Sequence, residues 1–473
     1  MPSTVFDSVL FRDMFGTAEM RAVFCDEALI GRCLEAEAAL ACVQGRLGVI
    51  PAEAAKAIAS ASRTIVIDYD HLRTETEVVG YPILPLLHQL SAAAGEAGRY
   101  VHWGATTQDI MDTAVVLQIK SAMTIIKRDL LELRGIMAGL AKRYRNTPMA
   151  GRTHLQHALP VTFGYKVAVW LSCVDRHLQR LDQALPRILV GQFSGAAGTL
   201  ASVGERGLEV QRLYCEELGL WQPQITWHVA RDGLTEAVNL LGLITATFGK
   251  VATDIMLMCA TEFGELAEPF VQGRGASSTM PQKRNPISSE LMLASAKLVR
   301  QHVATMLDGA IHDFERATGP WHLEWTAVPE SFLLTATSLA NAKFVMAGLI
   351  VNEVRMSENL ALTNGLITAE AVMMAAANKL GRQRAHHVVY SACRIAVEQG
   401  RILSDVLAEA DEIVDALGGI EAIAFHSDPS NYLGLAGEMV DRVVKGLPQP
   451  SGAKVLDKLT TIAAPGHSGS ADG

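Results

Sequence analysis

The chain has 473 residues, of which 49% are hydrophobic and 6% aromatic, and its formal net charge is −9. Its length exceeds the roughly 250–300 residues that one hydrophobic core supports, so two or three subdomains or one elongated body are expected. The low aromatic content predicts an all-α fold, and the scattered Lys and Arg exclude a basic tract of the kind that binds nucleic acid or a membrane surface.

The N-terminal segment and the cysteines predict a cytoplasmic protein. The first residues, "MPSTVFDSVLFRDMFG", lack a basic stretch followed by an apolar core, so no secretory signal is expected. No uncharged apolar run reaches the roughly 18 residues of a membrane span. The seven cysteines are dispersed and form no C-x-x-C pair, which favours reduced, buried thiols.

Residues 1–110 are expected to form an N-terminal domain of shorter helices, and a central domain over 111–356 is expected to contain longer ones. After "GATTQD", apolar residues recur at alternating spacings of three and four, which predicts one long packed helix. These residues are Val116, Ile119, Met123, Ile126, Leu130, Leu133, Met137 and Leu140.

The same spacing returns twice in the central domain. It predicts a second long helix through Ala237, Leu241, Ile244, Phe248, Val251, Ile255 and Met258. A third is expected from about Pro286 past Leu307, with Asn285 as N-cap and Pro286 at the first helical position. Helices of about 30 residues are about 45 Å long, so they should pack as a near-antiparallel bundle at about 20°.

The end of the chain is expected to form a C-terminal helical domain over 357–446 and then a flexible tail over 447–473. The tail, "LPQPSGAKVLDKLTTIAAPGHSGSADG", is rich in small polar residues that do not support a packed core. No phosphate-binding loop, H-E-x-x-H motif or zinc-type spacing occurs in the sequence, so neither a cofactor nor a metal is expected.

Polar segments interrupt the apolar helical pattern at three places. They are "VHWGATTQD" at 101–109, "GRTHLQHALPVTFG" at 151–164 and "GRGASSTMPQKRNPISSE" at 273–290. Taken singly, Thr106, Thr107 and Asp109 could merely cap a helix that begins near Ile110, and His154 could be an ordinary hydrogen-bonded histidine. Because each segment adjoins a long predicted helix, where backbone N–H groups can bind an anion, the three are predicted to meet in one cleft.

The third segment matches the signature S-S-x-M-P-x-K-x-N-x-x-x-x-E from Ser277 to Glu290, and on this match the chain resembles the fumarase/aspartase superfamily. The first two segments and "GQFSGAAGTLAS" at 191–202 resemble other regions of that superfamily. The resemblance covers the chain up to about residue 446. It implies a homotetramer with a central helical bundle, in which each active site takes the three segments from three different subunits, and it implies a small polycarboxylate substrate.

The resemblance also implies a role for each residue of the three segments. Ser277 is expected to be the catalytic base and His154 the general acid, with Glu290 pairing with His154. The expected substrate-binding residues are Lys283 and Asn285 for the carboxylate beside the reacting carbon, Ser278 next to them, Thr106, Thr107 and Gln108 for a second carboxylate, and Thr153, Gln156 and His102 around the same pocket. Gly273 and Gly275 would supply the hinge of a lid.

Several branches of the superfamily stay open. "RYVHWGATTQDIMDT", "TMPQKRNP" and "ERATGPWHLEW" resemble the 3-carboxy-cis,cis-muconate cycloisomerases, but that branch has tryptophan where this chain has His154. We therefore expect a lyase that performs anti β-elimination on an aspartate-like or N-substituted succinate, with the cycloisomerase reaction as the alternative.

Two further alternatives are disfavoured. Adenylosuccinate lyase is less favoured because Trp325 stands where that branch has a phosphate-binding arginine and Thr76 replaces an early histidine. The bulk of Trp321 and Trp325 favours a smaller polycarboxylate, with simple packing of both side chains as the alternative. An inert, crystallin-like role is disfavoured because Ser277, Lys283 and the other signature residues are intact.

Overall fold

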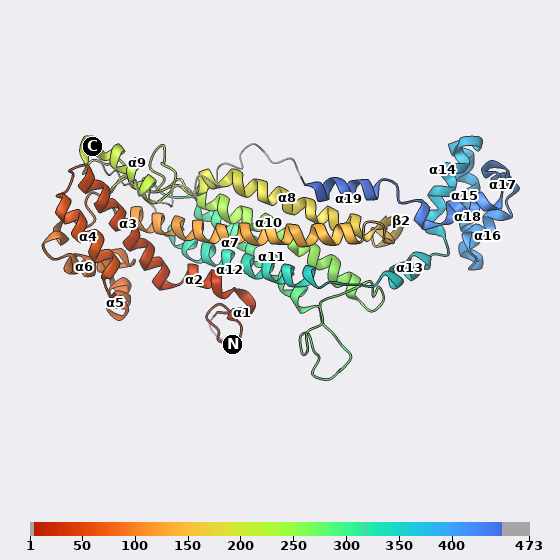
Figure 1. Cartoon of the computed structure of the whole chain (residues 1–473), viewed down its shortest axis with the longest axis horizontal. Helices are drawn as coiled ribbons and strands as arrows, with labels where there is room; N and C mark the ends of the chain where they lie inside the picture. Colours follow the sequence, from red (N-terminus) through yellow and green to blue (C-terminus); the bar gives the residue numbers. More distant parts are fainter. Residues whose placement is uncertain (1–3, 317, 447–473) are drawn as a thin grey trace, which may run out of the picture.

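The computed structural model describes residues 4–316 and 318–446, and it confirms the all-α prediction. Long helices run side by side through the middle of an elongated molecule, and smaller helices gather at its two ends (Figure 1). Strands within the described residues are confined to two antiparallel pairs. These pairs are β1 (Pro148–Thr153) with β2 (Gln156–Thr162), and β3 (Leu266–Ala267) with β4 (Ile350–Val351). The predicted tail over 447–473 lies outside the described residues.

The N-terminal end of the molecule consists of short helices around α3. Its elements are α1 (Arg12–Phe15), α2 (Ala18–Val23), α3 (Asp26–Arg46), α4 (Ala52–Thr64), α5 (Tyr69–Val79), α6 (Ile83–Ala94) and η1 (Gly95–Tyr100), joined by η2 (Gly204–Arg206) and α9 (Gly207–Glu217) from later in the chain. α3 packs against α4, α9 and the first long helix. This end is therefore built on the same core as the bundle.

The bundle consists of long helices that run back and forth along the molecule. They are α7 (Thr107–Arg143), α8 (Phe163–Ile188), α10 (Asp232–Cys259), α11 (Ile287–Gly309) and α12 (Pro320–Ala347). Most of the apolar positions that predicted α7 are fully buried, including Val116, Ile126 and Leu133. α7 has 37 residues and so extends over about 55 Å.

The helix α10 is apolar on more than its buried face. Among the helices of the described residues, α10 is the single helix long and apolar enough to cross a membrane. Half of its most apolar 18-residue stretch is buried inside the protein. The bent pair formed by 353–361 and 366–380 passes the same test only as one unit. Leu243 and Leu257 leave apolar surface of α10 exposed in the single chain.

The start of α11 differs from the prediction. The helix begins at Ile287, with Pro286 rather than Asn285 at the cap position. The Glu268 carboxylate accepts hydrogen bonds from the backbone N–H groups of Ser288 at 3.2 Å and Ser289 at 2.8 Å. The cap therefore comes from a residue 20 positions away, and the backbone of Asn285 is used elsewhere in the loop.

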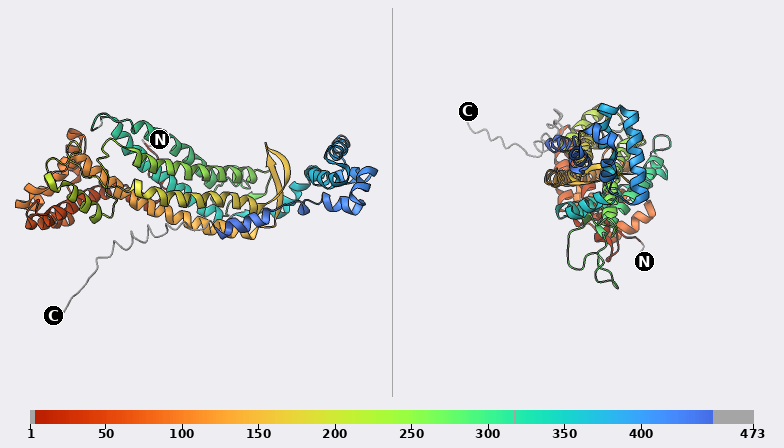
Figure 2. Two further views of the ribbon diagram at one scale, coloured as in Figure 1. Left: turned by 90° about the horizontal axis from the view of Figure 1, so that it is seen from above. Right: turned by 90° about the vertical axis from the view of Figure 1, so that its right-hand side faces the viewer.

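The C-terminal end has a separate apolar core. The elements at this end are α13 (Glu353–Ala361), η3 (Leu366–Thr368), α14 (Ala369–Leu380), α15 (Arg382–Gln399), α16 (Leu403–Ala408), α17 (Asp411–Leu417), α18 (Ile420–Ser427) and η4 (Pro429–Asn431). The buried residues of the separate core come from α14 to α18. The last helix, α19 (Ala436–Lys445), returns along the bundle against α7 and α8. Figure 2 shows the β1–β2 hairpin between the bundle and these C-terminal helices.

Candidate active site

The first polar segment forms the N-terminus of α7, as predicted. Thr106 is the N-cap and forms a capping box with Asp109. The fully buried Asp109 carboxylate also accepts hydrogen bonds from the backbone N–H groups of Ser194 at 3.0 Å and Gly195 at 2.9 Å, and it pairs with His228 Nε2 at 2.8 Å. Asp109 therefore fixes this segment to the "GQFSG" stretch, and its role here is structural.

The side chains of the first segment differ in what they leave available. Gln108 is buried, and its side-chain amide donates to the carbonyl oxygen of His228 at 2.8 Å. The Gln108 side chain therefore holds the backbone at His228 in place. Thr107 is partly exposed. Thr106 Oγ1 accepts a hydrogen bond from the guanidinium of Arg316, which sequence reasoning did not select although it lies within "ERATGPW". Arg316 thus brings a cation to the N-terminus of α7.

His102 occupies a strained turn just before α7. Its φ angle is 61°, in the left-handed region that residues with a side chain rarely adopt. Its Nδ1 lies 2.5 Å from a carboxylate oxygen of Glu37 on α3, whose side chain is 1% exposed. Sequence reasoning missed Glu37, although one acidic residue in the apolar face of a helix is a signal that could have found it.

The second polar segment is a β-hairpin, which the sequence reading did not predict. Thr153 pairs directly with Gln156 across a two-residue turn. The turn residues His154 and Leu155 both have positive φ, at 51° and 62°. This is the mark of a type I′ turn, which normally takes Asn-Gly because other residues are strained there. All four residues are exposed, so the hairpin presents His154 at its tip.

The base of the hairpin is held by a buried ion pair. The Arg152 guanidinium donates to both carboxylate oxygens of Glu265, at 3.0 and 2.6 Å, and Glu265 is fully buried. Asn359 on α13 donates to the same carboxylate at 2.8 Å. This network ties the hairpin to the segment after α10 and to the C-terminal helices.

The third polar segment is a loop between α10 and α11 with a narrow neck. The backbone N–H of Asn285 donates to the carbonyl oxygen of Gly275 at 2.9 Å, and Ala276 forms a bridge with Arg284. Gly275 has a φ of 69°, and a Cβ atom there would lie 2.4 Å from the Asn285 carbonyl oxygen. Glycine is therefore required at this position.

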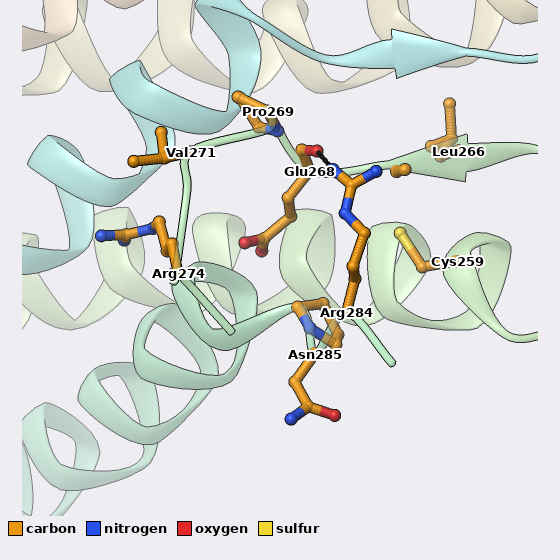
Figure 3. Close-up of a pocket in the computed structure, with 10 residues that line it drawn as sticks. Cys259, Leu266, Glu268, Pro269, Val271, Arg274, Arg284 and Asn285 are labelled. Atoms are coloured by element: carbon orange, nitrogen blue, oxygen red, sulfur yellow. Dashed lines mark hydrogen bonds between the residues drawn. The ribbon is translucent and has the colours of Figure 1, made fainter. Parts of the chain in front are cut away.

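Two arginines hold the neck of this loop on the bundle. Arg274 donates to Ser288 Oγ at 2.7 Å, and Arg284 donates to the carbonyl oxygen of Glu268 at 3.1 Å. They line a cavity of about 160 Å³ (Figure 3), from which the Asn285 amide points away. Cys259 also lines it, and burial raises the pKa of this thiol to about 11, which makes it unreactive.

Two backbone N–H groups donate to the side chain of Ser277, the first serine of the signature. Ser277 Oγ accepts hydrogen bonds from the backbone N–H groups of Thr279 at 3.3 Å and Met280 at 3.1 Å. Such donors stabilise an alkoxide more than a hydroxyl. Across residues 4–316 and 318–446, no hydrogen bond is found for the side chains of Ser278, Lys283, Glu290 or His154, all of which are exposed.

One chain does not bring the three segments together. Thr106, Thr107 and Gln108 lie at the start of α7, while Thr153, His154 and Gln156 follow its end, so the length of α7 separates them (Figure 1). The signature loop leaves the bundle at the hairpin end, where α10 ends and α11 begins. Within the described part of the chain, His154 and Glu290 do not form the predicted pair.

The two tryptophans considered for the pocket have different surroundings. Trp321 is 6% exposed, and its Nε1 donates to Asp112 at 3.3 Å, so it is a packing residue. Trp325 is 36% exposed and packs edge-to-face on Trp321 at 5.2 Å. Of these two tryptophans, Trp325 is therefore the one with an exposed aromatic surface.

Family comparison matches most of the chain. A family described as "Lyase" matches residues 15–300, and one described as "Adenylosuccinate lyase C-terminus" matches residues 365–443. The first match spans more than half of the sequence.

Curated relatives cover nearly the whole chain. Trans-aconitate decarboxylase 1 of Mycosarcoma maydis is 45% identical over 93% of this chain and 89% of its own length. A 3-carboxy-cis,cis-muconate cycloisomerase of Pseudomonas aeruginosa is 44% identical over 92% and 95%. An N-acetyl-S-(2-succino)cysteine lyase of Enterococcus italicus is 41% identical over 94% and 97%.

Solved structures share the fold over the same range. A fumarate lyase from Mesorhizobium sp. BNC1 is 55% identical, with a TM-score of 0.87 over 92% of this chain and 99% of its own. The 3-carboxy-cis,cis-muconate lactonizing enzyme from Pseudomonas putida is 38% identical, with a TM-score of 0.87 over 93% and 98%.

The glycine at the neck of the signature loop gives a direct test of its geometry. Gly275→Ala should open the neck, because the new Cβ would collide with the backbone of Asn285. We expect faster proteolysis and faster amide exchange across 276–284. Gly273→Ala is the matched control, since it has a similar φ of 81° but nothing within 4 Å of the new Cβ. Equal protection of the loop in Gly275→Ala and wild type would contradict the described neck.

Proposed function

The chain belongs to the fumarase/aspartase superfamily and is an enzyme of the lyase or cycloisomerase type, and from this premise we propose that it is a lyase that performs anti β-elimination. The substrate is an aspartate-like or N-substituted succinate, and the product is fumarate or a close analogue. The observation that carries the proposal is Ser277, whose Oγ accepts two backbone N–H groups on an exposed loop that also bears Lys283.

Proton abstraction is the first step of the proposed reaction. Ser277, as the alkoxide, takes a proton from the carbon beside a substrate carboxylate, and the electron pair moves into that carboxylate. Lys283 and Asn285 bind this group, whose negative charge grows as the proton leaves, so they act mostly in the transition state. Closure of the loop about its neck would exclude water and strengthen these interactions.

Loss of the substituent completes the reaction. The electron pair held in the carboxylate returns to form the carbon–carbon double bond, the bond between the adjacent carbon and its heteroatom breaks, and the heteroatom leaves with the bonding pair and takes a proton from His154. Glu290 from another subunit would orient the imidazole. The exposed position of His154 on a strained turn, without a hydrogen-bond partner among the described residues, supports a role at a shared site.

The substrate's second carboxylate would bind at the N-terminus of α7. Thr106 supplies a hydroxyl there, Thr107 supplies a hydroxyl and a backbone N–H, and Arg316 adds the positive charge. A relative that is named for a succinylated cysteine supports a substituted succinate as the substrate skeleton. It also extends the candidate leaving groups from amines to thiols.

The cycloisomerase reaction is the second candidate. The similarity to cycloisomerases over nearly the full length of the chain favours it. Against it stands His154, because the resemblance implies tryptophan at this position in that branch, and ring closure to a lactone has no amine to protonate.

We also propose that the enzyme is a cytoplasmic homotetramer. The distance between the first segment and the hairpin supports an active site assembled from several subunits. The exposed Leu243 and Leu257 on α10, together with a groove of about 510 Å³ between α10 and α11, give apolar surface for a partner helix. The cysteines of the described residues form no disulfide, which fits a reducing compartment.

A paired absorbance assay tests the proposed function. Purified enzyme is given argininosuccinate, N-substituted aspartates and S-(2-succinyl)cysteine, and the appearance of fumarate is followed. We expect fumarate from at least one of them, and Ser277→Ala should lower that rate by at least about a thousandfold while the substrate still binds. Separate reactions contain 3-carboxy-cis,cis-muconate and trans-aconitate. Consumption of the muconate or of trans-aconitate, without fumarate from any succinate, would show that the proposal is wrong.

Subunit mixing tests the shared site. Ser277→Ala and His154→Gln should each be inactive, but a refolded equal mixture should regain about a quarter of wild-type activity. The reason is that a site with Ser277 and His154 from different subunits has a one-in-four chance of receiving both native residues. The double variant Ser277→Ala/His154→Gln, mixed with inactive single variants, serves as the control. A mixture with no regained activity would place both residues in one subunit's site.

A further inference from the structure

Glu37 is a carboxylate inside an apolar helix face. It is 1% exposed, and its neighbours Cys33, Leu34 and Leu40 on α3 are buried with it. A buried carboxylate without a partner is strongly destabilising. Among the described residues, the side-chain partner of Glu37 is Nδ1 of His102, at 2.5 Å.

The turn that carries His102 is fixed from several sides. The Gln44 amide donates to the carbonyl oxygen of Trp103 at 2.7 Å. The backbone N–H of Ala105 donates to the carbonyl oxygen of His102 at 3.2 Å. Gly104 has a φ of 74°, and a Cβ atom there would lie 2.5 Å from Val203. The left-handed conformation of His102 is strained for a residue with a side chain, and these contacts maintain it.

This arrangement leaves Nε2 of the His102 imidazole without a hydrogen-bond partner among the described residues. Glu37 occupies Nδ1, while Nε2 has no hydrogen-bond partner within the described residues, and the side chain is 18% exposed. His102 lies four residues before Thr106, whose hydroxyl contacts Arg316. The N–H on Nε2 and the Arg316 guanidinium are thus donors at the same helix N-terminus.

We propose that Glu37 is a positioning residue that holds His102 by Nδ1, so that Nε2–H and Arg316 together bind the second carboxylate of the substrate. This proposal rests on the proposed function, because it specifies how that site recognises its dianionic substrate. It gives His102 a binding role and gives Glu37 a role through His102 alone.

The charges around His102 predict how binding responds to pH. Burial works against the charged imidazole, but Glu37 on α3 and Asp109 on α7 more than offset it, and the pKa of His102 is raised. Arg316 contacts Thr106, and His228 pairs with Asp109, so Glu37 is the carboxylate bound directly to the ring. Because the cation is the binding form, dicarboxylate affinity should fall as pH rises through the raised pKa.

Calorimetric titration with succinate across roughly pH 5.5 to 8.5, the range in which an imidazole titrates, tests this proposal. For the wild type, we expect affinity to fall by up to about tenfold per pH unit above the midpoint. In Glu37→Gln, the midpoint should move to lower pH, since an adjacent opposite charge is removed. Glu37→Asp should move it less, because the carboxylate is retained. Glu35→Gln, an exposed position on the same helix, is the matched control and should match the wild type.

The outcomes separate this proposal from the proposed function. Wild-type protein that binds succinate while Glu37→Gln keeps the same midpoint would overturn the role of Glu37 and leave the lyase proposal standing. Wild-type protein that binds succinate at no pH would overturn both. If Glu37→Gln does not fold, His102→Gln replaces it in the same series. That variant should lose the pH dependence, and retention of the wild-type profile would overturn the proposal.

Discussion

The length of α7 is the constraint on which the arrangement of the candidate site depends. One straight helix of 37 residues separates the N-terminal cap at Thr106 from the hairpin that follows Arg143. Each end is then locked, by Asp109 at the first and by the Arg152–Glu265 pair at the second. Neither segment can move far enough to meet the other. A reaction that needs groups from both segments therefore needs more than one copy of the chain.

Charge is used in two different ways in this acidic protein. Arg231 is fully buried and is neutralised by the carboxylates of Asp112 and Glu324, so its charge serves the fold. Arg316 and Lys283 are not paired with a carboxylate in the described chain. Since the net charge of −9 does not attract anions, a dianionic substrate has to be held by such local donors. Arg316 contacts the first polar segment and Lys283 lies on the third, where the proposed function requires positive charge.

The long helices could be predicted because their buried apolar residues recur in the sequence at the spacing of an α-helix. Seven of the eight apolar positions that predicted α7 are buried, and the capping role of Thr106 and Asp109 was expected from local chemistry. The hairpin escaped prediction because "THLQ" has no Asn or Gly to announce a type I′ turn. Glu268, Glu37 and Arg316 act on residues 20, 65 and 210 positions away, and spacing within a segment cannot reveal such contacts.

Backbone strain coincides with the proposed chemistry. Among the described residues other than glycine, positive φ occurs at His102, His154, Leu155, Leu200, Phe314 and Asn364. Three of these lie in the first two polar segments, and Phe314 is 91% exposed two residues before Arg316. A fold gains nothing from placing a histidine where glycine would be relaxed, so the cost is retained for the side chain. At both His102 and His154 the strained backbone displays an imidazole, and buried ion pairs beneath each turn keep it in place.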